Sequence, residues 1–181
     1  ANGAMGRYRP DDISVGDLDG DGNYELVLKW MPDNQQDNGY NGYTSPCIID
    51  AYRMDGTRLW RVNLGLNIRS GNHYTQFLVY DFDGDGKAEA VMRAADGTTI
   101  HCADGTTYVV GDASKNYRAA TGGGTNWFMH DGAEYLVYMN GETGKPYQCI
   151  EYPLKRLETG ETNLEAAWGD GYGHRSSKHF F

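Results

Sequence analysis

The sequence predicts an all-β fold in which one small antiparallel sheet is repeated along the chain. Three observations support this prediction. An unusual acidic string occurs twice, each copy leads into a short apolar run, and an alternating apolar hairpin follows each run. No segment longer than one or two turns shows helical periodicity. Repeated sheets of three or four strands are typical of the blades of a β-propeller, which need neighbouring blades to bury their faces.

The acidic string begins at Asp17 as DLDGDGNYE and recurs 64 residues later, at Asp81, as DFDGDGKAE. Ca²⁺ takes six to eight oxygen ligands at about 2.3–2.6 Å, and alternating carboxylates on a tight turn supply them. An EF-hand is excluded because its bidentate Glu stands at loop position twelve, where this sequence has Leu28 and Met92. The sequence therefore predicts two calcium loops, with a metal-free acidic turn as the alternative.

The expected calcium ligands occupy equivalent positions in the two loops. Side chains of Asp and Glu provide most of them, and backbone carbonyl groups help at the seventh position. The residues are Asp17, Asp19, Asp21, Asn23 and Glu25 in the first loop and Asp81, Asp83, Asp85, Lys87 and Glu89 in the second. Without a cation, three carboxylates within five residues would repel one another strongly.

Strands are expected directly after the loops, at residues 25–30 and 89–93, because both runs are short and apolar. Hairpins are expected at residues 48–62, around an Asp-Gly turn, and at residues 135–150, around a longer turn that contains Asn-Gly.

These elements group into blade units. One unit covers about residues 11–66, a second about 74–152, and a third starts at about 166 and continues to 181. A propeller closes with about four to eight blades. We therefore expect the chain to be a truncated part of one propeller domain. The exposed blade faces, including the final pair Phe180-Phe181, are expected to contact the remaining blades or to cause self-association.

Composition excludes several classes of protein. The formal net charge is −9, and much of it comes from the six Asp and two Glu of the loops, so nucleic-acid binding is not expected. No apolar run approaches 18 residues, so no membrane span is expected. Weak calcium loops would stay empty at cytosolic calcium concentrations, which favours a secreted, periplasmic or cell-surface location.

The three cysteines, Cys47, Cys102 and Cys149, lack CxxC spacing. They are expected to be small buried apolar residues, with a Cys102–Cys149 bridge as the alternative.

Several separate strings carry a family resemblance. The longest runs from Asn67 to Thr98, and with others it resembles the rhamnogalacturonan lyases of polysaccharide lyase family 11. The other strings lie at residues 14–22, 28–30, 37–38, 42–44, 49–60 and 168–175. The resemblance implies an eight-bladed, calcium-rich propeller that cleaves the rhamnose-(1→4)-galacturonate bond of pectic rhamnogalacturonan I by β-elimination.

Such an elimination removes the proton on C5 of galacturonate, beside a carboxylate. A cation must neutralise that carboxylate, and a base must accept the proton. The resemblance places the catalytic base and the metal-binding histidines in later blades, so the catalytic residues of this chain stay unknown. A non-catalytic, calcium-stabilised propeller that binds carbohydrate or protein is the alternative function.

Two positions depart from the family pattern. Asp11 stands where the family usually has an Asn that touches substrate; the acid keeps acceptor capacity but loses a donor, and a solvated turn is the alternative. Met31 stands where the family often has Asp, and a thioether is a poor partner for a sugar hydroxyl.

Four further residues are candidates for substrate binding. Trp30 could stack on a sugar ring or belong to the core, and Arg69 and His73 could contact substrate or serve as structural residues at a strand end. Arg93 could face the cleft or pair with a neighbouring carboxylate.

Overall fold

The computed structural model describes residues 6–36, 42–73, 75–117, 132–155 and 169. Within these ranges the chain forms ten β-strands in two antiparallel sheets and no α-helix, which confirms the all-β prediction. The first sheet has the order β1 (Tyr8–Gly16), β2 (Glu25–Pro32), β3 (Ile48–Tyr52), β4 (Arg58–Asn63), β7 (Thr99–His101) and β8 (Thr107–Val109). The second has the order β10 (Pro146–Glu151), β9 (Glu134–Met139), β6 (Glu89–Ala95) and β5 (Phe77–Tyr80).

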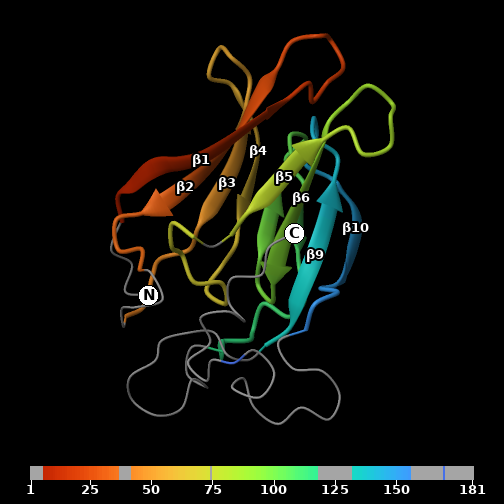
Figure 1. Ribbon diagram of the computed structural model, residues 1–181. Helices are drawn as coiled ribbons and strands as arrows, with labels where there is room; N and C mark the ends of the chain where they lie inside the picture. The colour runs from red at the N-terminus through yellow and green to blue at the C-terminus, as the bar shows by residue number, and fades with distance from the viewer. Residues whose placement is uncertain (1–5, 37–41, 74, 118–131, 156–168, 170–181) are drawn as a thin grey trace.

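The local predictions agree with this topology. The strands expected after the acidic strings are β2 and β6, and the expected hairpins are β3–β4 and β9–β10. Both acidic strings connect the edge strand of a sheet to the next strand, β1 to β2 and β5 to β6, and they lie at the same end of the two sheets (Figure 1).

The hairpin β7–β8 was not anticipated, although Asp104-Gly105 is an ordinary hairpin turn signal. It extends the first sheet, because β7 pairs with β4 through Arg61 opposite His101 and Val62 opposite Ile100. The range 74–152, expected to be a single blade unit, therefore contributes strands to both sheets.

The core lies between the two sheets. Alternate residues of β2, β3 and β4 point toward it, and they meet the buried residues of β6 and β9. On the second sheet these include Ala90, Met92, Ala94, Val137 and Met139. The edge strands β1 and β5 lie beside each other where the sheets meet (Figure 1).

Two glycines allow the sheets to approach closely near the acidic loops. A Cβ at Gly16 would lie 2.8 Å from Cβ of Ala88, and a Cβ at Gly141 would lie 2.8 Å from Cδ2 of Leu18 and would also overlap the Ala88 carbonyl oxygen of its own sheet. The Trp60 indole donates a 2.6 Å hydrogen bond to the carbonyl oxygen of Gly141. The backbone of Ala88 is therefore enclosed from both sides.

The cysteine expectation holds in part. All three thiols are free, and Cys47 and Cys102 are buried, whereas Cys149 is exposed. The expectation is wrong for Cys149 because β10 is an edge strand whose residues mostly face solvent. No helix in the described part of the chain is long and apolar enough to cross a membrane.

Replacing Gly141 by Ala should destabilise the chain by about 3 kcal/mol, because the added methyl group overlaps backbone that cannot move away easily. Urea unfolding followed by tryptophan fluorescence measures the loss. The matched control is Gly105→Ala, where φ is +83° but no atom lies within 4 Å. It should cost about 1–2 kcal/mol. Equal losses for the two variants would contradict the proposed close approach.

Candidate functional site

The first acidic loop is closed by hydrogen bonds to its own carboxylates. Asp17 Oδ1 accepts the Gly20 amide at 2.7 Å, and Asp17 Oδ2 accepts the Gly22 amide at 2.8 Å. Glu25, the first residue of β2, reaches back and accepts the Leu18 amide at 2.9 Å. Backbone donors therefore hold carboxylates from both ends of the loop.

The second loop repeats this geometry. Asp81 Oδ1 accepts the Gly84 amide at 2.7 Å, Asp81 Oδ2 accepts the Gly86 amide at 3.0 Å, and Glu89 accepts the Phe82 amide at 2.9 Å. The fourth and sixth residues of both loops have φ between +79° and +91°, a region in which glycine is strongly favoured. Two sequences that differ at several positions therefore fold into the same loop.

The carboxylates converge in both loops. Ligand-type oxygens lie within 4.8 Å of one another in the groups Asp17, Asp19 and Glu25 and Asp81, Asp83 and Asp85. The predicted side-chain ligands Asp21 and Glu89 are not members of these groups. An all-oxygen set of this kind suits a hard cation such as Ca²⁺.

The carboxylates of the first loop are also electrostatically crowded. Burial raises the pKa of Glu25, and the negative charges of Asp19, Asp21 and Asp17 raise it further, against the opposing hydrogen bond from Leu18. A bound cation would relieve this repulsion. The chemistry of the donor set therefore fits calcium in both loops.

Asp11 belongs to a cluster that the sequence did not reveal. The register of β1 shifts between Pro10 and Ile13, and the irregularity brings Asp11 and Asp12 to the Lys29 ammonium of β2. The distance from Lys29 Nζ to Asp11 Oδ2 is 2.9 Å, and Asp12 is also in contact. Lys29 is fully buried, whereas the two carboxylates reach solvent.

The charge of Lys29 is secured by these contacts. Burial alone would lower its pKa, but the hydrogen bonds to Asp12 and Asp11 outweigh burial and raise the pKa above its ordinary value. The sequence feature that could have revealed this cluster is a lysine in an alternating apolar strand, because a buried ammonium needs partners of opposite charge.

Trp30 and Met31 point to opposite faces of the first sheet. Trp30 is half-buried on the face turned away from the core, and its ring meets the Tyr52 ring edge-on at 6.5 Å and 76°. Met31 is fully buried on the core face, with its sulfur 3.9 Å from Sγ of Cys47. The thioether therefore packs in the core in this structure.

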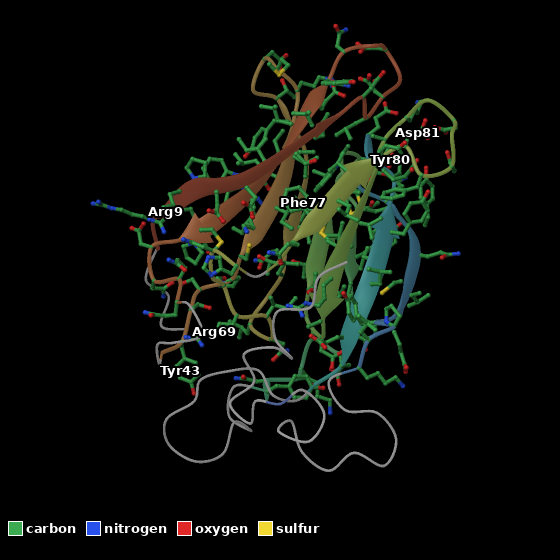
Figure 2. All side chains as sticks on the ribbon, in the orientation of Figure 1. Arg9, Tyr43, Arg69, Phe77, Tyr80 and Asp81 are labelled. Carbon is green, nitrogen blue, oxygen red and sulfur yellow. The ribbon has the colours of Figure 1, made fainter. Side chains whose placement is uncertain are left out.

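The remaining candidates lie on separate segments, Arg69 and His73 between β4 and β5 and Arg93 in β6. Arg69 and Arg93 are buried, and Arg93 Nη1 lies 3.3 Å from Oε1 of the half-buried Glu134, the carboxylate pairing considered above. His73 is exposed, and its carbonyl oxygen accepts a 3.2 Å hydrogen bond from Gln76. Figure 2 shows Asp81 in the loop beyond β5 and Arg69 toward the opposite end of the molecule. The five candidates therefore do not share one solvent-facing surface.

These features define an all-β protein of two antiparallel sheets, each with an acidic loop between its edge strand and the next strand. The model of the rhamnogalacturonan lyase family 11 C-terminal domain matches residues 1–180, and the chain belongs to this family.

Similar proteins come from Bacillus. The rhamnogalacturonan exolyase YesX of Bacillus subtilis (strain 168) is 50% identical over 173 residues, which are 94% of this chain and 26% of YesX. The rhamnogalacturonan endolyase YesW of the same strain is 51% identical over 168 residues, 93% of this chain and 25% of YesW. The chain thus spans about a quarter of the length of these relatives.

Solved structures show the same relationship. The crystal structure of the exotype lyase YesX matches this chain with a TM-score of 0.79 at 51% identity. The match covers 93% of this chain and 25% of the YesX chain. The structure of the Bacillus licheniformis rhamnogalacturonan lyase PL11 matches with a TM-score of 0.80 at 50% identity. This match covers 96% of this chain and 27% of the PL11 chain.

Replacing Lys29 by Met should destabilise the chain by about 2–3 kcal/mol, because the two carboxylates lose their charged donor while the aliphatic volume is kept. The raised pKa sets the pH dependence. Stabilisation by Lys29 should be complete below its unfolded pKa of about 10.4 and should disappear as the pH rises through the higher folded pKa. Urea unfolding of both proteins between pH 6 and pH 11 tests this.

The control for this variant is Lys115→Met, whose ammonium is exposed and lies 3.9 Å from Asp112. It should change stability by less than about 0.5 kcal/mol. A Lys29→Met protein as stable as the control at pH 7 would show that the buried ammonium contributes nothing.

Proposed function

We propose that this chain forms part of the C-terminal domain of a polysaccharide lyase that cleaves the rhamnose-(1→4)-galacturonate backbone of rhamnogalacturonan I by β-elimination. The single observation that carries the proposal is the identity of about one half to both an exolyase and an endolyase over more than nine-tenths of this chain. Exolytic or endolytic action is left open, because the chain is equally similar to both.

The architecture proposed for the whole protein is a β-propeller in which further sheets continue the stacking of these two. Leu18 and Phe82 hold the same position in the two acidic loops. Leu18 is fully buried where the sheets meet, whereas Phe82 is 45% exposed and contacts the rings of Tyr80 and Tyr138. An additional sheet would bury Phe82 as the second sheet buries Leu18. In isolation the exposed face would favour self-association.

Calcium is the proposed cofactor of both loops. The ligands are the Asp and Glu side chains of each loop, with carbonyl groups of Asn23 and Lys87. A bound ion neutralises the crowded carboxylates and fixes the connection between two strands. Since cytosolic calcium is too low for weak sites, we also propose a secreted, periplasmic or cell-surface location.

The roles proposed for individual residues follow from their exposure. Asp11 accepts hydrogen bonds from sugar hydroxyl groups, and the Lys29 ammonium holds its carboxylate in place. His73 is the second proposed contact because it is exposed. Arg69 and Arg93 are buried, so they support the surrounding chain, and Trp30 offers a half-buried ring. The groups that take the C5 proton and neutralise the substrate carboxylate lie outside this chain.

Removal of calcium should lower the thermal midpoint. Binding at a hundredfold excess over Kd stabilises by about 2.7 kcal/mol per site, which corresponds to roughly 5–10 °C for a chain of this size. Melting curves in calcium and in EDTA measure the effect. Asp83→Ala should remove at least half of it, and Asp104→Asn should remove none, because Asp104 pairs with Lys145 outside the loops. Identical midpoints in calcium and EDTA would contradict calcium binding.

The function is tested by a chimera in which this chain replaces the matching quarter of YesX. The chimera should cleave rhamnogalacturonan I and generate the ultraviolet absorbance of an unsaturated uronate, whereas the 181-residue chain alone should not. Unmodified YesX is the positive control. A chimera that melts cooperatively in calcium but is inactive would favour the non-catalytic binding module. Turnover by the chain alone would place a base within it, with Arg69, His73 and Arg93 the first to mutate.

A further inference from the structure

We propose that the two acidic loops are coupled, so that a cation bound in one loop strengthens binding in the other. The inference rests on the proposed calcium function and concerns the contact between the loops. The backbone carbonyl oxygen of Asp17 accepts a 2.7 Å hydrogen bond from the amide of Ala88. This bond joins the first loop directly to the second, although the two residues are far apart in sequence.

Both ends of this hydrogen bond belong to ligand segments. Asp17 supplies the first carboxylate of the first loop, and Ala88 lies between Lys87 and Glu89 of the second. A cation that fixes Asp17 therefore fixes the acceptor, and a cation that fixes Lys87 and Glu89 fixes the donor. Each ion would therefore order part of the backbone that must be ordered before the other ion can bind.

Side-chain packing reinforces the connection. Leu18 follows Asp17 in the first loop and is fully buried. Its Cδ2 atom lies 2.8 Å from the place that a Cβ of Gly141 would occupy, beside the carbonyl group of Ala88. The Lys87 side chain of the second loop also lies against Gly20 of the first, with Cγ 3.1 Å from the place of a Gly20 Cβ. The loops therefore share a packed contact as well as a hydrogen bond.

The two loops differ in one respect that sets the order of filling. Arg53 Nη2 lies 3.3 Å from Asp19 Oδ2, so a cation entering the first loop must compete with a guanidinium group. In the described ranges no basic side chain forms an ion pair with Asp81, Asp83 or Asp85 of the second loop. The second loop should therefore fill first and favour filling of the first loop.

Thermodynamic linkage relates the coupling between the loops to association constants that can be measured. If the coupling factor is α, the product of the two association constants equals α times the product of the constants of the isolated loops, and the effect is reciprocal. A shared hydrogen bond with its packing contact corresponds to a factor of about five to ten.

Calorimetric titration of the 181-residue chain with Ca²⁺ measures this factor. Asp83→Ala disables the second loop and reports the isolated first loop, and Asp21→Ala does the reverse. Asp21 is chosen because its removal leaves the Arg53–Asp19 pair in place. The product of the two wild-type constants should exceed the product of the two variant constants by about five- to tenfold. Asp85→Ala and Asp17→Ala serve as second variants if either protein fails to melt cooperatively.

Two further variants separate the components. Leu18→Ala keeps every ligand and backbone donor but removes packing, so it should bring the ratio closer to one while the chain still binds two ions. Arg53→Gln should increase the affinity of the first loop for calcium without changing the ratio of wild-type to variant products. Asp104→Asn, outside the loops, should change neither constant.

The outcomes distinguish this inference from the calcium proposal itself. Two bound ions with a ratio of one overturn the coupling and leave calcium binding intact. Absence of any bound ion overturns both. The amide resonance of Ala88 provides a second readout, because in Asp83→Ala it should shift when calcium fills the first loop. An unmoved Ala88 resonance would also overturn the coupling.

Discussion

The contact on which the rest of the structure depends encloses the Ala88 backbone between Asp17 of the first acidic loop and Gly141 of the turn between β9 and β10. Its amide donates to Asp17, and its carbonyl oxygen occupies the space that a side chain at Gly141 would need. Leu18, the residue after Asp17, is fully buried in the core beside this contact. Because the first acidic loop begins and the second ends at this contact, the packing of the sheets and the geometry of the loops cannot vary independently.

Buried charge is the second constraint, and the charges of Lys29 and Asp50 both have partners of opposite sign. Lys29 is held by Asp11 and Asp12, and the fully buried Asp50 accepts two hydrogen bonds of 2.7 Å from Arg61 as well as one from Tyr52. Burial of charge contributes little net stability, but loss of one partner is costly. These clusters therefore act mainly by specifying which strands pair and in which register.

In the proposed lyase, this chain and the rest of the domain have different roles. This chain provides the two acidic loops and one carboxylate, Asp11, that the buried Lys29 ammonium keeps in place. Proton abstraction and charge neutralisation require groups placed around the substrate by the complete domain. The burial of Met31 against Cys47 is consistent with a packing role for this departure from the family pattern.

The sequence by itself determined what depends on neighbouring residues. Both acidic loops, the strands that follow them and the hairpins β3–β4 and β9–β10 were predicted because turn glycines, carboxylate spacing and apolar alternation act within a few residues. Only the tertiary structure decided the pairing of β7 with β4, the exposure of Cys149 and the contacts of Lys29. Each of these requires segments that are distant in sequence to meet, and a local pattern carries no information about the identity of its partner.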